Sequence, residues 1–170
     1  MRCLATLALS LALTLTAAAG QDAAGGSLSI RIAEPLQKAL AASYGSEEAL
    51  VLQQAVSDGV ARATRRARLD TRPQPRTEVL LSDARPSHPT RHQQSQNPGI
   101  DPVHSMSLGG ATLSAVLRDA DGRELERVSV EHYANSFAEA SASLDAWADA
   151  RLTIDRFADR LVQAYRRQLH

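Results

Sequence analysis

The carboxyl-terminal segment carries the pattern that most constrains the fold, because it predicts a long amphipathic helix. Ser141 or Ser143 is expected to cap the start of this helix. Its apolar side chains recur every three or four residues and form one stripe, which consists of Leu144, Trp147, Ile154, Ala158, Leu161 and Tyr165. Charged side chains lie elsewhere on the helix, namely Asp145, Asp149, Asp155, Asp159 and Arg166. Such a helix buries its stripe, so the rest of the chain must supply an apolar surface.

A β-hairpin is the main part of that expected surface. Residues 110–119 alternate apolar with polar side chains, residues 120–122 supply a glycine-containing turn, and residues 123–133 return as a second strand. In the returning strand Leu125 falls on the opposite phase from the valines that follow it. This change of phase predicts a bulge near Glu126-Arg127.

Two more strands and two more helices are predicted before the hairpin. Residues 28–32 alternate like a half-buried strand, and residues 77–84 are apolar on both faces like a central strand. A short helix is expected from Glu34-Pro35 to Ala42. A second helix, capped by Ser46, should run to about Arg68. Its predicted buried face consists of Leu52, Val56, Val60 and Ala63.

This order of elements predicts one α+β domain over residues 28–170, preceded by a flexible segment over residues 21–27. The expected architecture is a mostly antiparallel sheet of about four strands, with helices packed on one face. The roughly 150 residues that follow the amino-terminal segment are enough for one domain with a sizeable core.

The first twenty residues have the three features of a cleavable secretory signal peptide in the correct order. Arg2 supplies positive charge, Leu4 to Ala17 form an uncharged apolar run, and small residues follow up to Gly20. Cleavage is expected near Ala19 or Gly20. The apolar run is about fourteen residues long, below the roughly twenty that cross a hydrocarbon core, so a retained anchor is the weaker alternative. The mature protein is therefore expected to be periplasmic or secreted, without a membrane span.

Cysteine and charge content restrict the chemistry of the mature protein. Cys3 is the only cysteine and precedes the apolar run, so removal of the signal leaves no thiol for disulfides, thiolate metal sites or catalysis. Loss of Arg2 takes the 19 basic residues to 18, against 19 acidic residues. A nearly neutral chain has no global field that would select nucleic acid as a partner. No cofactor is predicted.

Residues 85–107 form a long segment with four prolines, three histidines and a Gln-rich tract, and without periodicity. It is expected to be a loop that is either functional or disordered. His88, His92 and His104 are the candidate metal ligands, with Asp101 nearby. The alternatives are solvated histidines or a small metal-dependent or hydrolytic enzyme. The chain has no His-Glu-x-x-His helix and no Gly-x-Ser-x-Gly nucleophile turn to support an enzyme.

Arginines are concentrated around the expected end of the second helix. Cations are favoured at a helix carboxyl end, which explains the cluster without a ligand. Alternatively, guanidinium groups match phosphate oxygens, so the cluster is a candidate site for anionic lipid or glycan. Its members are Arg62, Arg65, Arg66, Arg68, Arg72 and Arg76.

Three stretches carry a resemblance to known proteins, and together they cover roughly residues 78–165. They are LSDARPSHPTR, SLGGATLSAVLRDADGRELERV and DRFADRL. The pattern resembles small proteobacterial exported proteins of unknown function and is similar to envelope accessory lipoproteins. The resemblance implies an assembly or accessory role, although this chain lacks the lipid-bearing cysteine of the lipoproteins. The leading expectation is a non-enzymatic envelope protein that presents its long loop and a strand edge to a partner.

Overall fold

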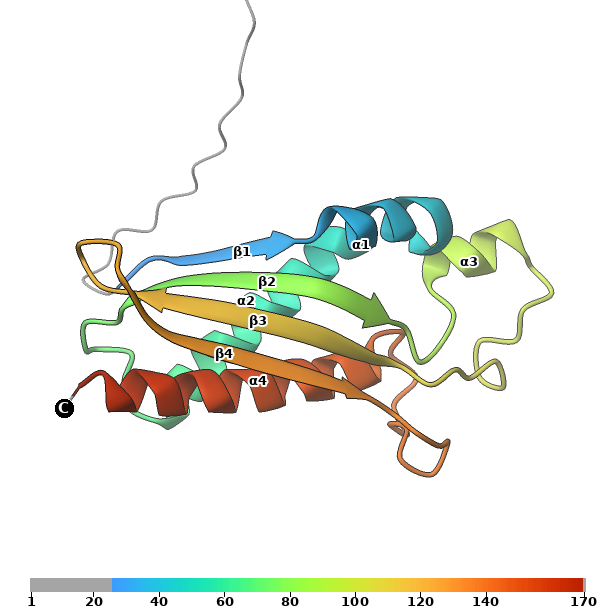
Figure 1. Ribbon diagram of the computed structural model, residues 1–170. Coiled ribbons are helices and arrows are strands. Elements are labelled where there is room, and N and C mark those ends of the chain that lie inside the picture. The colour runs from blue at the N-terminus through green and yellow to red at the C-terminus, as the bar shows by residue number, and fades with distance from the viewer. Residues whose placement is uncertain (1–25, 170) are drawn as a thin grey trace, which may run out of the picture.

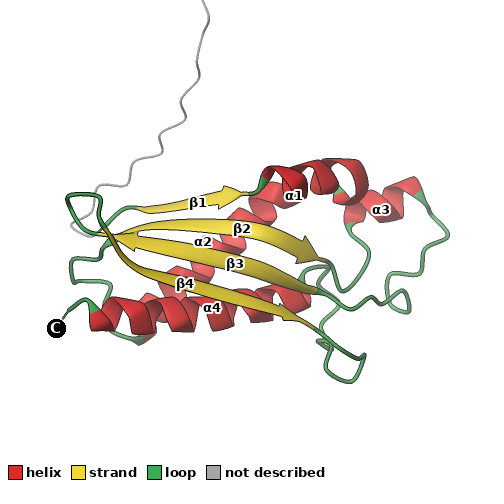
Figure 2. Ribbon diagram, in the orientation of Figure 1, coloured by secondary structure: helices red, strands yellow, loops and turns green. Residues whose placement is uncertain are grey.

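A computed structural model describes residues 26–169 and shows an α+β fold in two layers (Figures 1 and 2). One layer is a four-stranded sheet in the order β1-β2-β3-β4. Its strands are β1 (Leu28–Ile32), β2 (Arg76–Arg85), β3 (Gly110–Arg118) and β4 (Glu124–Tyr133). The predicted α+β class and four strands are confirmed. The predicted signal peptide and residues 21–25 of the predicted flexible segment lie outside the described residues.

The sheet is mixed, whereas a mostly antiparallel sheet was expected. β1 pairs in parallel with β2, and the pairs β2–β3 and β3–β4 are antiparallel. The parallel pair follows from the connection, because a crossover through helices returns the chain to the end from which it started. That crossover consists of α1 (Glu34–Ala39), the π-helical turn η1 (Leu40–Tyr44) and α2 (Glu48–Arg66).

The β3–β4 hairpin forms as predicted, and so does its irregularity. Leu117 pairs with Glu126 but Arg118 pairs with Glu124, so Leu125 is the extra residue of a bulge. The bulge lies one residue before the predicted position. It restores the phase of the strand, because Val128 and Val130 are buried against the helices.

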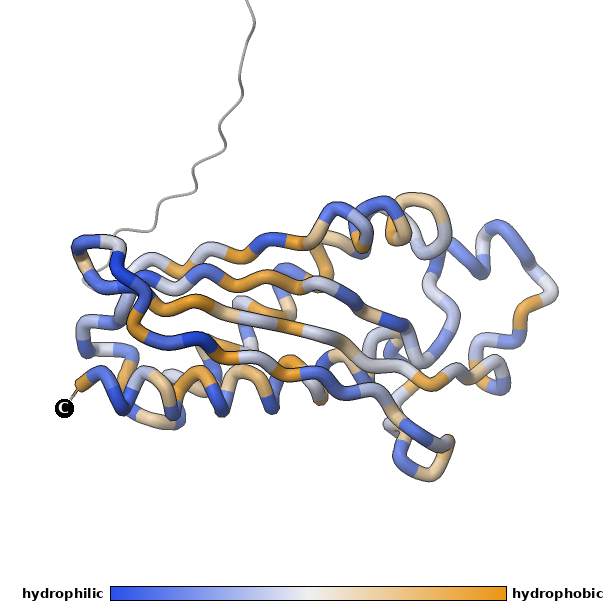
Figure 3. Tube along the Cα trace, in the orientation of Figure 1, coloured by the Kyte–Doolittle hydropathy of each residue, from blue (hydrophilic) through white to orange (hydrophobic). Residues whose placement is uncertain are grey.

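Helices α2 and α4 (Ala148–Arg167) cover one face of the sheet, which fixes the position of the core (Figure 1). Figure 3 shows the apolar stretches on the central strands and on α4 that meet there. The strands contribute alternate side chains to this core, including Val79, Leu81, Leu113 and Leu117. No helix within residues 26–169 has the length and apolar character needed to cross a membrane.

The predicted starts of two helices were wrong. The residue before α2 is Glu47, not Ser46, and α4 begins only at Ala148, without a side-chain cap. The chain before Ala148 forms turns, so the helical stripe does not extend back to Leu144, which is 62% exposed. Asp149, expected on the solvent side, is buried at 3% exposure.

Candidate functional site

The segment between β2 and β3, expected to be a loop, lies at one end of the sheet and is mostly irregular, with one short helix (Figure 1). It contains α3 (Arg91–Gln96), which begins with a capping box between Thr90 and Gln93. The Thr90 hydroxyl also donates to the backbone oxygen of Tyr44 at 2.6 Å. This hydrogen bond attaches the segment to η1.

Buried polar contacts fix both ends of this segment. The backbone N–H of Ser87 donates to the oxygen of Ala146 at 2.7 Å, and the Ser107 hydroxyl donates to the oxygen of Pro86 at 2.6 Å. The Asp149 carboxylate accepts from the N–H groups of Gly109 at 3.2 Å and Ser141 at 2.7 Å. Asp149 thereby joins the segments before β3 and before α4.

The three predicted metal ligands are not brought together in one site. His88 is 3% exposed, whereas His92 is partly buried on α3 and His104 is exposed. Within residues 26–169 no three His, Cys, Asp or Glu side chains are grouped so that they could hold a metal ion. Metal binding by His88, His92 and His104 therefore stays a prediction, and the described residues do not form a ligand group that supports it.

Asp101 and His104 form the only close pair among the residues expected to carry chemistry in this segment. His104 Nδ1 lies 2.6 Å from Asp101 Oδ2, and both side chains are exposed. The hydrogen bond from His104, together with the backbone N–H groups of Val103 and His104, lowers the pKa of Asp101 to about 2. These contacts form a local turn that is exposed to solvent. The pair of Asp101 and His104 therefore does not lie in a buried pocket that could hold a substrate.

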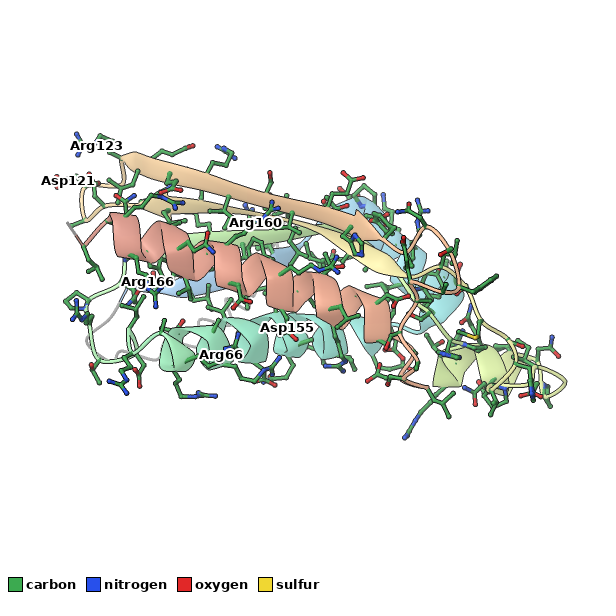
Figure 4. All side chains as sticks on the ribbon, turned by 90° about the horizontal axis from the view of Figure 1, so that it is seen from below. Arg66, Asp121, Arg123, Asp155, Arg160 and Arg166 are labelled. Atoms are coloured by element: carbon green, nitrogen blue, oxygen red, sulfur yellow. The ribbon has the colours of Figure 1, made fainter. Side chains whose placement is uncertain are left out.

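Two members of the predicted arginine cluster form ion pairs with α4, and the other four do not. Arg62 pairs with Asp155 at 3.0 Å and Arg66 pairs with Asp159 at 2.8 Å. Figure 4 shows the two helices side by side, with Asp155 on α4 and Arg66 on α2 labelled. The other four members are exposed and form no ion pair with any described residue: Arg65, Arg68, Arg72 and Arg76.

A groove of mixed polar and apolar lining, which the sequence did not predict, lies between the outer edge of β1 and α2. Its volume is about 1070 Å³. Exposed apolar side chains lie along it, notably Leu50, which is 71% exposed, with Val51 and Leu28. Leu50 and Val51 lie outside the buried stripe of α2. This adjacent pair of exposed apolar residues is the only signal in the sequence that could have indicated the groove.

Comparison with known protein families, with curated proteins and with solved structures finds no match to this chain.

Proposed function

We propose that this chain is an exported, non-enzymatic accessory or binding protein of the cell envelope, and that its partner protein adds an extended strand to β1. The single observation that carries the proposal is the groove, with its exposed apolar side chains, beside the edge of β1 that pairs with no other strand among residues 26–169. Strand addition uses backbone hydrogen bonds for affinity and side-chain pockets for specificity.

The backbone of β1 offers suitable groups at its outer edge. The oxygen of Ser27 accepts from Thr77 and the N–H of Ala33 donates to Leu81, so alternate residues of β1 face β2. Leu28 and Ile30 therefore direct their backbone groups to the free edge. The oxygen of Ile30 already accepts from the Gln53 side chain at 3.4 Å, a contact that a partner strand could replace.

The other edge of the sheet is less suited to strand addition. β4 contains four charged side chains, and Arg160 donates to the backbone oxygen of Ser129 at 3.2 Å. Charged edge strands resist pairing with other chains. β1 has Arg31 as its only charged residue and borders a groove with exposed Leu50 and Val51, so it is the edge that favours a partner.

The proposal that the protein is exported rests on the predicted amino-terminal signal peptide, which lies outside the described residues. The non-enzymatic part is supported by the use of polar groups in the segment between β2 and β3. Ser87, Thr90 and Ser107 hold backbone groups in place, which are structural roles.

Site-specific photocrosslinking in intact cells tests the proposal. A benzoylphenylalanine replaces Ser29 on β1 in one variant and Ser129 on β4 in a matched control. We expect the same envelope protein to crosslink reproducibly to position 29 and not to position 129. Leu50→Lys and Val51→Lys should reduce that product, because lysine charges oppose a strand that buries apolar side chains in the groove.

Phe137→Lys is the matched substitution control, because Phe137 is an exposed apolar residue outside the groove. It should leave the crosslink unchanged. Equal products from both photoreactive positions, or a product that survives Leu50→Lys and Val51→Lys, would show that the β1 edge is not the binding surface.

A further inference from the structure

A separate cavity of about 420 Å³, open to solvent, is lined mainly by the segment that joins β2 to β3. This volume is within the range of pockets that hold small organic molecules. None of its lining residues belongs to the groove beside β1. Most of its wall is apolar and comes from Tyr44, Pro86, Pro89, Ile100, Met106 and Leu108.

His88 adds a polar group that the protein itself does not satisfy. Its Nδ1 lies 3.2 Å from the backbone oxygen of Pro102. A carbonyl oxygen only accepts, so Nδ1 carries a hydrogen, and Nε2 is an acceptor whenever the ring is uncharged. That Nε2 is buried and has no hydrogen-bond partner among the described residues. A buried acceptor without a donor is unfavourable, and a ligand N–H or O–H that reached it, after a shift of the side chains that cover it, would relieve this.

Arg85 also lines this cavity, and most of its side chain, 63%, is exposed, so its positive charge is available beside the cavity. Its guanidinium group lies 4.8 Å from the centre of the Tyr133 ring, which restricts its position. Arg85 Nε is 3.6 Å from Asp83 Oδ2, and that oxygen also accepts from the Tyr133 hydroxyl at 2.7 Å. The long, shared contact leaves Arg85 donors for an external anion.

We propose that this cavity binds a small amphipathic anion. Its apolar body contacts the proline, isoleucine and methionine side chains of the wall, and its anionic group pairs with Arg85. An N–H or O–H group of the ligand donates to His88 Nε2. The proposal does not depend on strand addition at β1, because the two sites have no residue in common.

The probe is 1-anilinonaphthalene-8-sulfonate, which combines an apolar aromatic body, a sulfonate and an N–H donor. Trp147 is the only tryptophan and is in edge contact with Tyr44, at a ring-centroid distance of 5.8 Å. Because Tyr44 lines the cavity, bound probe should quench Trp147 by energy transfer. We expect saturable binding of one probe per chain, measured by titration of the folded, full-length mature protein.

Three variants locate the binding. Arg85→Gln and His88→Leu should each weaken it by about tenfold, because each removes one polar contact with the ligand. Arg123→Gln, at the β3–β4 turn, is the matched charge control and should bind like the wild type. Circular dichroism checks that each variant is folded, since this probe also binds partly unfolded chains.

Ile100→Phe, which narrows the cavity without removing either polar group, serves as an independent test if His88→Leu does not fold. It should abolish energy transfer. Undiminished binding by Arg85→Gln, or the absence of transfer from Trp147, would place the probe elsewhere on the protein and overturn the proposal.

Discussion

Trp147 connects three parts of the structure through the two ends of its side chain. Its ring is 1% exposed and packs edge to face against Tyr44 of η1. Its indole N–H donates to Glu48 Oε2 at 2.6 Å, at the start of α2. The indole of Trp147 therefore does two things: its ring fills space in the core, and its N–H satisfies the buried Glu48 carboxylate. Loss of the ring and loss of the hydrogen bond should have separable costs.

Trp147→Ala should lower the free energy of unfolding by about 3–5 kcal/mol, because it leaves a large cavity. Trp147→Phe keeps an aromatic ring but leaves the Glu48 carboxylate without its donor, at a cost of about 1–3 kcal/mol. Glu48→Gln keeps an acceptor for the indole and should cost less than Trp147→Phe. Urea unfolding measures all three. Wild-type stability in Trp147→Phe, or native fluorescence like that of exposed indole, would contradict this description.

Burial of Trp147 was predictable from the sequence, but burial of Asp149 was not. The stripe that included Trp147 correctly gave the inner face from Ile154 onward, because helical periodicity applies there. It failed at Leu144, where the chain is not helical. Asp149 is buried because Gly109 and Ser141 approach it from other segments, and helical periodicity contains no information about such contacts.

Helices α2 and α4 approach each other closely at Gly59. A β-carbon placed on Gly59 would lie 2.9 Å from the Cγ2 atom of Ile154. Ile154 is buried, and its Cγ2 methyl is attached to a branched β-carbon, so it cannot easily move away. The two exposed ion pairs along these helices contribute little by comparison, about 0–1 kcal/mol each. Packing at Gly59 therefore decides how closely the helices approach.

Gly59→Ala tests which of two opposing effects is larger. Alanine favours helix formation by up to about 1 kcal/mol over glycine. Overpacking in a filled core costs about 1–3 kcal/mol. We expect a net loss of stability, measured by thermal or urea unfolding. In an Ile154→Leu background, which removes the methyl from the β-carbon, the same substitution should become neutral or stabilising. A stabilising effect of Gly59→Ala in the wild-type background would mean that the helices are not in close contact.

The elements differ in how far local sequence determines them. The β3–β4 hairpin was predictable because alternation and a glycine turn act over neighbouring residues. The short helix α3 was missed, although Thr90 and Gln93 have the spacing of a capping box. The parallel pairing of β1 could not be derived from its five residues, because it depends on the crossover through α2. The groove beside β1 is a consequence of that same pairing.

At the scale of the whole molecule, the balance of 19 basic and 19 acidic residues conceals a local excess of arginine. Arg65, Arg68, Arg72 and Arg76 follow one another around the end of α2 and the connection to β2. Each arginine near an anionic membrane surface contributes about 1 kcal/mol. Four give about 4 kcal/mol, which corresponds to a dissociation constant of about 1 mM. The cluster is therefore too weak to hold the protein on an anionic membrane by itself.

The ion pairs with α4 keep Arg62 and Arg66 from adding to the membrane affinity, so their removal should raise that affinity. Asp155→Asn with Asp159→Asn releases Arg62 and Arg66, which adds about 2 kcal/mol, or roughly thirtyfold, to vesicle affinity. Cosedimentation with phosphatidylglycerol vesicles measures this at about 25 mM and about 150 mM salt, and binding should weaken steeply at the higher concentration because of screening. Arg65→Gln with Arg68→Gln should reverse the gain. A vesicle affinity that changes neither with salt concentration nor with these substitutions would exclude the arginine cluster as an anion-binding surface.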